Sequence, residues 1–245
     1  MPNGFLAAAG VFVGARGAGV AWSLAVLAAA VAAMCLSVVA NAFNDYDDRA
    51  IDAIIHPGRP LPSGTLTPAT ALRIVAIAAV GGVVLSAFAR PTLGVVSIGV
   101  IGVMLAYGRI KAHSGLAANA TVAVLGSMPF LYGAWAAGEP RAGAVLVGIA
   151  APLHFAREIA KDVDDIDGDR GRRRTLPITA GVGVARVIEA AATLVFIVAW
   201  IVFLDARWIA FPAVLLAMAA AYWGMPAIYK AAMAVAMIAY YVSRP

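Results

Sequence analysis

Two short segments of this chain hold most of its carboxylates. Of 13 acidic residues, nine are aspartates within residues 44–52 (Asn-Asp-Tyr-Asp-Asp-Arg-Ala-Ile-Asp) and 162–169 (Asp-Val-Asp-Asp-Ile-Asp-Gly-Asp). Both segments repeat one frame, in which three aspartates are spaced by three and then by four residues: Asp45, Asp48 and Asp52, then Asp162, Asp165 and Asp169. On a helix, this spacing places three carboxylates on one face.

Three carboxylates on one helix face need a compensating charge. Like charges four residues apart cost about 0.2–0.5 kcal/mol per pair. Each segment also follows an apolar run, where the helix dipole and desolvation near a bilayer both disfavour anions. A bound cation offsets these costs, and oxygen ligands favour Mg²⁺ or Ca²⁺. Mg²⁺ commonly binds one or two carboxylates together with substrate phosphates. Two solvated acidic loops are the alternative, and the repeated frame argues against it.

Basic residues near the two segments are suited to binding phosphate oxygens. Carboxylates together with convergent cations indicate a metal–diphosphate site rather than a metal transporter. The candidates for binding the diphosphate are Arg59, Lys111, Arg157 and Lys161. Arg59 lies in a stretch rich in Pro and Gly, residues 53–64, which favours a lid or a holder for this side chain. The arginines interpreted as membrane-topology signals or surface ion pairs are Arg170, Arg172, Arg173 and Arg174.

The elements that must position these residues are membrane helices. The chain has 245 residues, 63% hydrophobic and 13% charged, with a mean hydropathy of +0.90. Soluble domains have about 45–50% apolar and about 25% charged residues, and one soluble core cannot bury such a surplus. We therefore predict an all-α, polytopic membrane protein with a single transmembrane domain over residues 1–245. The apolar runs cover residues 5–14, 22–43, 69–88, 92–108, 116–137, 142–160, 178–203, 207–224 and 226–242.

These runs predict about nine transmembrane helices, or eight if the weak boundary at residues 224–226 does not separate the last two. Two polar stretches, residues 44–68 and 157–177, are predicted to be loops on one side of the membrane. Thirteen basic residues fall on that side and five on the other, so the positive-inside rule places both loops in the cytoplasm. This bias explains the net charge of +5, and we expect no nucleic-acid partner. No cleavable signal pattern opens the sequence, so we expect insertion through the helices themselves.

The acidic segments resemble the signatures of the UbiA superfamily of intramembrane prenyltransferases. Asn44, Asp48 and Asp52 match the first signature, Asn-x-x-x-Asp-x-x-x-Asp. Asp165 and Asp169 match the second, Asp-x-x-x-Asp. The two signatures together form a highly specific pair.

Other segments carry the same resemblance. Residues 107–111 and 119–123 are similar to the middle loop and fifth helix of the family. Residues 157–178 look most like the archaeal-type members that transfer a geranylgeranyl group to geranylgeranylglycerol phosphate. The resemblance implies nine transmembrane helices around a central cavity that opens to lipid. It also implies two Mg²⁺ ions that bridge a diphosphate between the two aspartate motifs.

The resemblance further implies roles for individual residues. The residues assigned to the two Mg²⁺ sites are Asn44, Asp45, Asp48 and Asp52 in the first motif and Asp162, Asp165 and Asp169 in the second. The catalytic role falls on Asp48, Asp52, Asp165 and Asp169. As a hypothesis, Arg59, Lys111 and Lys161 help to stabilise the negative charge that develops when the allylic C–O bond breaks. An acceptor oxygen or carbon then attacks the allylic carbocation.

Aromatic and small residues are candidates for lining the substrate cavity. The candidates are Tyr46, Tyr107, Asn119, Phe130, Tyr132 and Phe155, with ordinary helix packing as the alternative for the aromatic rings. Gly126, Gly133 and Ala134 would let a prenyl chain lie against the backbone. The same three residues are equally suited to close contact between helices, and the sequence does not separate these uses.

The expected partners are an isoprenyl diphosphate donor, a lipophilic acceptor and membrane lipid, with the active site of a multi-pass cell-membrane protein facing the cytoplasm. The expected acceptor is geranylgeranylglycerol phosphate, and an aromatic quinone precursor or a tetrapyrrole acid is the alternative. A divalent-cation or phosphate transporter is a more distant possibility. Transporters tend to place charge at the bilayer midplane, whereas these acids lie at the ends of apolar runs. A non-catalytic scaffold would leave the cost of the clustered charges without an explanation.

Overall fold

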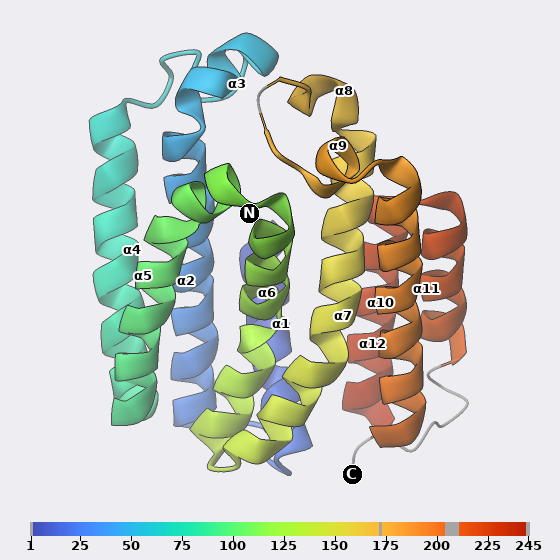
Figure 1. Ribbon diagram of the computed structural model, residues 1–245. Helices are drawn as coiled ribbons and strands as arrows, with labels where there is room; N and C mark the ends of the chain where they lie inside the picture. Colours follow the sequence, from blue (N-terminus) through green and yellow to red (C-terminus); the bar gives the residue numbers. More distant parts are fainter. Residues whose placement is uncertain (1, 172, 204–210, 244–245) are drawn as a thin grey trace.

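The chain folds into a bundle of α-helices, and no β-strand occurs over residues 2–171, 173–203 and 211–243, which the computed structural model describes. The helices are α1 (Pro2–Gly17), α2 (Leu24–Asp47), α3 (Arg49–Ile55), α4 (Pro68–Ala89), α5 (Pro91–His113), α6 (Gly115–Ala137), α7 (Pro140–Asp164), α8 (Ile166–Asp169), α9 (Leu176–Thr179), α10 (Val182–Phe203), α11 (Phe211–Trp223) and α12 (Pro226–Ser243). The longer helices stand side by side, while α3, α8 and α9 lie at one end of the bundle (Figure 1). The predicted all-α class is confirmed.

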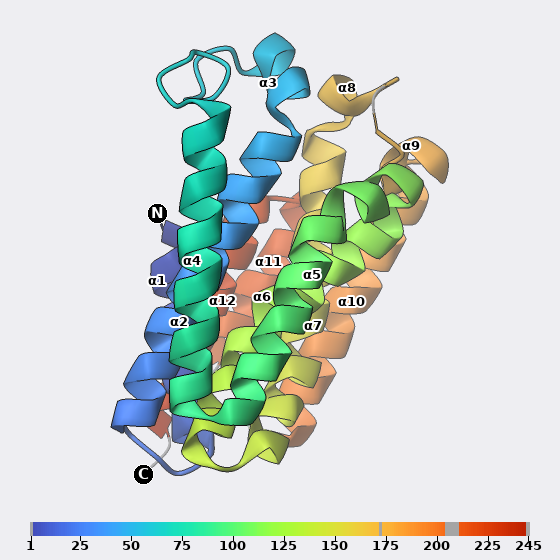
Figure 2. The same cartoon turned by 90° about the vertical axis from the view of Figure 1, so that its left-hand side faces the viewer.

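Successive long helices run in opposite directions, and this path determines where the acidic segments lie. Both α2 and α7 run toward the end that carries α3 and α8, as Figures 1 and 2 show from two sides. The aspartates at the C-terminal ends of α2 and α7 therefore reach the same end of the bundle, which we call the acidic end. Both polar stretches therefore lie at one end of the bundle, and their position on one side of a membrane stays a prediction.

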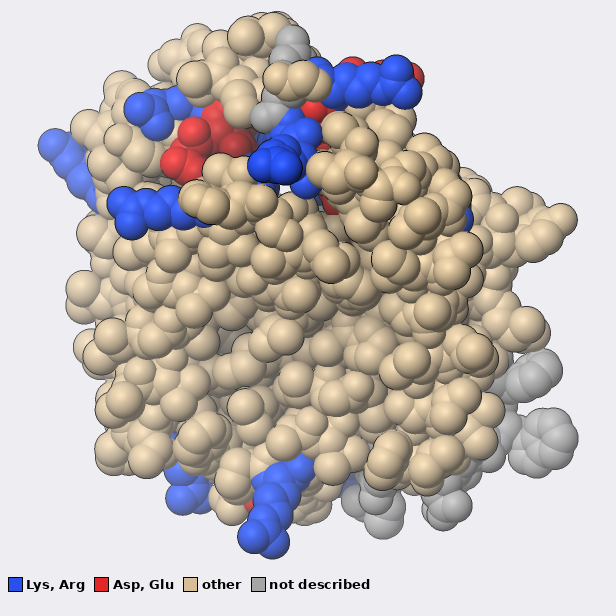
Figure 3. Space-filling view, viewed as in Figure 1, with Lys and Arg blue, Asp and Glu red and all other residues tan. Residues whose placement is uncertain are grey.

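Lipid is the solvent for much of the bundle surface. Seven helices within the described ranges are long and apolar enough to cross a membrane: α2, α4, α5, α6, α7, α10 and α12. Their outward side chains are apolar, for example Ile77, Val80 and Val84 of α4, which are all exposed. Figure 3 shows a broad belt without charged side chains between the two ends of this face. The chain is an integral membrane protein.

Two helices of the bundle are short: α1 has 16 residues and α11 has 13. Both are shorter than the roughly 20 residues that span a bilayer, so the number nine stays a prediction. Residues 207–210, which begin the predicted apolar run 207–224, lie outside the described residues. The boundary at residues 224–226 is a true helix break, because Gly224 takes a left-handed φ of 62° and α12 begins at Pro226.

The turn between α5 and α6 is fastened to the segment that follows α8. Ser114 ends α5 and caps the start of α6 with its side chain. The next residue, Gly115, donates its N–H to the carbonyl oxygen of Arg174 at 3.1 Å. A Cβ at Gly115 would lie 2.6 Å from that oxygen, so the close approach requires glycine. This contact brings Lys111 and Asn119, on either side of the turn, next to the second acidic segment.

Small residues serve two different purposes in α6. A Cβ on Gly133 would overlap the carbonyl oxygen of Val11 in α1, and the neighbouring Ala134 is fully buried. These two residues therefore allow helices to pack closely. Gly126 instead lines an internal cavity, where a Cβ would meet Nδ1 of His154 at 3.0 Å. The structure thus separates the two uses that the sequence left open.

Candidate active site

A cavity of about 790 Å³ lies among α1, α2, α5, α6, α7, α10 and α12. Its lining on α6 extends from Gly115 to Tyr132, which is roughly 25 Å along a helix that rises about 1.5 Å per residue. Charged residues of both acidic segments line the acidic end, and apolar side chains such as Leu125, Phe130 and Phe196 line the remainder. The shape and chemistry suit an amphiphile with a charged head group and a long apolar chain.

The two acidic segments share one local structure. Asp48 ends α2 and begins α3, and Asp165 ends α7 and begins α8, both with φ near −80 to −90° and ψ near 0°. The backbone N–H of Asp48 donates to Asn44 at 2.9 Å, and that of Asp165 donates to Lys161 at 2.9 Å. Helical hydrogen bonding therefore continues into both segments, and much of residues 44–68 and 157–177 is helical where loops were predicted.

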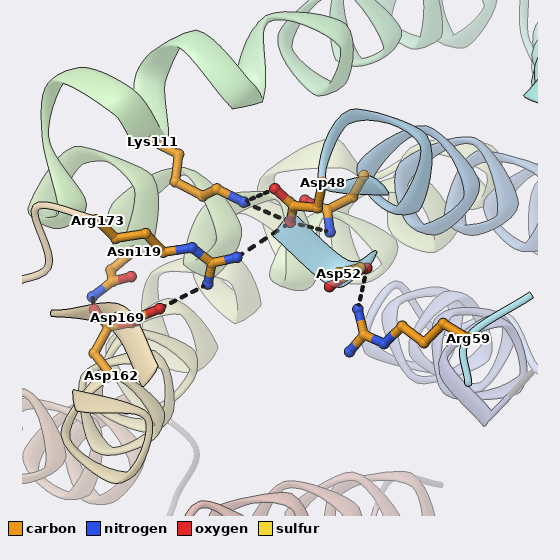
Figure 4. Close-up of polar contacts among 9 residues, drawn as sticks. Asp48, Asp52, Arg59, Lys111, Asn119, Asp162, Asp169 and Arg173 are labelled. Atoms are coloured by element: carbon orange, nitrogen blue, oxygen red, sulfur yellow. Dashed lines mark hydrogen bonds and ion pairs between the residues drawn. The ribbon is translucent and has the colours of Figure 1, made fainter. Parts of the chain in front are cut away.

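The first motif is held by cations from elsewhere in the chain. Nζ of Lys111 lies 2.8 and 2.7 Å from the two carboxylate oxygens of Asp48. The amide of Asn44 donates to the same carboxylate at 3.2 Å, and Nη1 of Arg59 lies 2.7 Å from Oδ2 of Asp52 (Figure 4). Both aspartates are buried. Buried carboxylates are stable only when they are paired in this way.

Arg173 links the two motifs. Its guanidinium lies 3.3 Å from Oδ1 of Asp169 and 3.5 Å from Oδ2 of Asp48, between the two acidic segments (Figure 4). Burial raises the pKa of the Asp169 carboxyl, and the positive charge of Arg173 acts in the opposite direction. This inward-facing role corrects the interpretation of Arg173 as only a topology signal or surface ion pair. Its position four residues after Asp169 was the available signal, although α8 ends at Asp169 and the contact is made from the turn that follows.

The other predicted polar residues also line the cavity. Asn119 donates to Oδ2 of Asp162 at 2.8 Å, which connects α6 to α7. Arg157 forms an ion pair with its neighbour Glu158. Asp45, Asp165 and Lys161 line the same cavity with exposed side chains.

The donor set fits Mg²⁺, although the carboxylates are engaged with cations. In the described part of the chain, no three His, Cys, Asp or Glu side chains lie close enough together to hold a metal ion. Lys111 and Arg173 contact Asp48, and Arg59 contacts Asp52. The ligands present are carboxylate and amide oxygens, which are the ligands that Mg²⁺ prefers. Metal binding would require these aspartates to exchange their cation partners.

Four of the six predicted cavity residues line the cavity: Tyr107, Asn119, Phe130 and Tyr132. Tyr46 and Phe155 are not among the described residues that do so. The ring of Tyr46 stacks under the guanidinium of Arg49 at 4.3 Å, and Phe155 packs against Ile159 and its neighbours. Both contacts match the alternative of ordinary helix packing.

The cavity also contains residues that sequence reasoning did not single out. They include His154, Glu158, Phe196, Trp200 and Lys230. Lys230 is a charged residue within the last apolar run, and this unusual position indicates a functional residue. No such signal exists in the sequence for Phe196 and Trp200, because aromatic side chains are common throughout membrane helices.

Comparisons with known proteins agree with this geometry. The UbiA prenyltransferase family matches residues 4–242. The digeranylgeranylglyceryl phosphate synthase of Halobacterium salinarum is 41% identical over 184 residues, a match that covers 73% of this chain and 66% of that protein. The match thus spans just under two thirds of that relative's length.

Solved structures share the fold. The apo structure of a UbiA homolog from Aeropyrum pernix K1 has a TM-score of 0.83 at 18% identity, covering 98% of this chain and 94% of that one. A structure described as giving structural and mechanistic insights into the biosynthesis of digeranylgeranylglyceryl phosphate synthase in membranes has a TM-score of 0.71 at 20% identity, covering 100% and 93%. The family match extends over nearly the whole chain, and the chain belongs to the UbiA prenyltransferase family.

Proposed function

We propose that this protein transfers a geranylgeranyl group from its diphosphate to geranylgeranylglycerol phosphate, in a reaction that depends on Mg²⁺. The observation that carries the proposal is the meeting of two aspartate motifs, linked by Arg173, at one end of a long and largely apolar cavity. The family and the names of similar proteins support this chemistry. We further propose that the protein lies in the cell membrane with the acidic end toward the cytoplasm.

The metal would be held by the two motifs. Asn44, Asp48 and Asp52 are the proposed ligands on one side, and Asp165 and Asp169 on the other. When bound there, Mg²⁺ supplies positive charge to the oxygens of the leaving diphosphate. The proposed supporting residues are Asp45 and Asp162, which line the same end of the cavity.

The cations of the site would act on the diphosphate directly. Lys111, Arg59 and Arg173 contact the motif aspartates, so each can turn to phosphoryl oxygens when a metal and a substrate occupy the site. Lys161 lines the cavity next to them. These charges stabilise the leaving group as the allylic C–O bond breaks and its electron pair goes to the diphosphate.

The acceptor completes the reaction. Its hydroxyl oxygen attacks the allylic carbocation, and its proton passes to the released diphosphate as the new C–O bond forms. The rings of Tyr107, Phe130 and Tyr132 line the cavity, where their faces can stabilise the carbocation. The acidic residues lie at helix ends rather than at the bilayer midplane, and this position favours an enzyme over a transporter.

The test is a transfer assay with the purified full chain in detergent. Geranylgeranyl diphosphate and a panel of acceptors should give diphosphate and a prenylated product with Mg²⁺, and neither should form in EDTA. Asp48→Asn and Asp165→Asn should abolish turnover. Asp167→Asn is the matched control, because the side chain of Asp167 is 94% exposed and lies outside the cavity lining. Activity in EDTA, or full activity of Asp48→Asn, would refute the proposal. A prenylated aromatic product instead would overturn the acceptor assignment.

A further inference from the structure

The cations that line the cavity fall into two groups. Arg59, Lys111 and Arg173 each form an ion pair with a motif aspartate. The second group, which we call the α7–α12 cations, consists of Arg157, Lys161 and Lys230. Arg157 pairs only with Glu158, and the other two form no ion pair with any described residue.

The α7–α12 cations share one wall of the cavity. Arg157 and Lys161 are four residues apart on α7 and therefore lie on one face. α12 packs against α7, and the charged groups that act on Lys230 are Arg157, Glu158 and Lys161. The three cations and Glu158 therefore form one electrostatic cluster at the acidic end of the cavity.

The position of Lys230 is set by its neighbour. Tyr229 is fully buried, and its hydroxyl lies 3.0 Å from Oε1 of Glu189 and 3.0 Å from the hydroxyl of Thr193, both on α10. These contacts fix the rotation of α12 about its axis. Lys230 is thereby held on the side of α12 that faces the cavity, where it is a lining residue.

The cluster has hydrogen-bonding capacity that the protein does not use. Nε of Arg157 is buried and has no hydrogen-bond partner within the described residues. Lys161 also acts on the carboxylates of Asp162 and Asp169, so Arg157 and Lys230 with Glu158 leave one positive charge on this wall. An anion at this wall would neutralise that charge and accept a hydrogen bond from Nε of Arg157.

We propose that Arg157 and Lys230 bind the phosphate monoester of the acceptor, while Lys161 stays with the diphosphate. This inference rests on the proposed function, and it names the acceptor class by its head group. A phosphate monoester carries about −1.5 to −2 charges at pH 7, and the two cations Arg157 and Lys230 can pair with it without a metal. Arg157, assigned to the diphosphate from the sequence, is thus moved to the second substrate.

The arrangement gives each amphiphilic substrate its own head-group site. The diphosphate of the donor occupies the aspartate motifs with Mg²⁺, and the phosphate of the acceptor occupies the α7–α12 wall without it. Both apolar chains extend into the cavity. An acceptor that lacks a phosphate gains nothing from Arg157 and Lys230, so this wall selects phosphorylated acceptors.

The test measures binding rather than turnover, so that it does not depend on the reaction. Calorimetry in detergent with EDTA compares geranylgeranylglycerol phosphate with geranylgeranylglycerol, which lacks the phosphate. The wild-type chain should bind the phosphorylated lipid more tightly without any metal. Lys230→Gln should weaken that binding by about tenfold, as expected for a lost charge-assisted hydrogen bond. Lys230→Gln should leave the binding of geranylgeranylglycerol unchanged.

Two controls separate local from general effects. Lys230→Arg keeps the charge and should restore most of the affinity. Arg170→Gln removes a charge at the same end, from a side chain that is 71% exposed and outside the cavity lining, and should change nothing. Unchanged binding by Lys230→Gln, or equal loss for both lipids, would overturn the proposal.

A last experiment tests whether these cations bind the phosphate of the acceptor or the diphosphate of the donor. With Mg²⁺ present, Lys230→Gln should bind geranylgeranyl diphosphate as the wild type does, and weaker donor binding would assign the α7–α12 cations to the diphosphate instead. Phosphate-selective binding without any prenyl transfer would refute the proposed function while leaving the subsite intact. Prenyl transfer without phosphate-selective binding would support the proposed function and refute the phosphate subsite.

Discussion

Lys111 bonds to both carboxylate oxygens of Asp48, at 2.8 and 2.7 Å, although 63 positions separate the two residues along the chain. Lys111 lies in the last turn of α5, and Asp48 joins α2 to α3. This pair shows how the protein tolerates buried carboxylates without a metal: its own cations neutralise them. Binding of metal and diphosphate would then be an exchange of partners, in which the carboxylates turn to the metal and the cations turn to phosphate.

Removal of Lys111 should have opposite effects on metal affinity and on catalysis. In Lys111→Gln, Asp48 loses a competing cation, so Mg²⁺ should bind more tightly in the absence of donor. The kcat should fall by about 10²–10³, because a charge that stabilises the leaving diphosphate is gone. Mg²⁺ calorimetry and turnover measure the two effects.

The matched control is Arg109→Gln. Arg109 lies on the same end of α5 with an exposed side chain and is not among the cavity-lining residues. The Mg²⁺ affinity and the kcat should both stay at the wild-type level in Arg109→Gln. Weaker Mg²⁺ binding by Lys111→Gln would contradict the exchange of partners.

Arg173 should hold the second acidic segment in place when metal and substrate are absent. Its guanidinium is the direct link between Asp48 and Asp169, so Arg173→Gln should increase amide hydrogen exchange in residues 165–176. Addition of Mg²⁺ with a diphosphate should restore protection, since a metal can replace the link. Arg170→Gln serves as the control. Equal exchange in wild type and Arg173→Gln would show that the link does not order this segment.

Gly133 should be indispensable for packing, whereas another helix glycine should not. A Cβ at Gly133 would overlap the carbonyl oxygen of Val11 and force α1 and α6 apart, so Gly133→Ala should lower the apparent Tm in detergent. Overpacking of this kind costs about 1–3 kcal/mol. Gly148 on α7 has open space around its Cβ position, and Gly148→Ala should not lower the Tm. Similar values for both variants would refute the packing role.

The contact between α10 and α12 should depend on the hydroxyl of Tyr229. In Tyr229→Phe, Oε1 of the buried Glu189 loses its donor, which should destabilise the fold by about 1–3 kcal/mol. The same change in a Glu189→Gln background should cost less, because a neutral amide is cheaper to leave unpaired. Thermal unfolding of the two single variants and the double variant measures this coupling. Additive effects would show that the two groups do not interact.

The sequence by itself was sufficient for the all-α membrane architecture and for the meeting of the two acidic segments at one end of the bundle. Apolar runs separated by short breaks predict alternating membrane helices, because helix length and hydrophobicity are local properties of the chain. Once the helices alternate, the ends of α2 and α7 must lie at one end of the bundle. Asp48 and Asp165 were therefore predictable as members of one site, and the repeated aspartate frame indicated a cation.

The pairing of charges was decided only by the tertiary structure. Arg173 is 125 positions from Asp48, and the charge of Arg157 acts on Lys230 because α12 packs against α7. Which cation contacts which carboxylate depends on side-chain distances of a few ångströms, and these follow from the packing of whole helices. Electrostatic energy depends strongly on such distances in a medium of low dielectric constant. Composition and spacing give the charges present, whereas helix packing determines which charges meet.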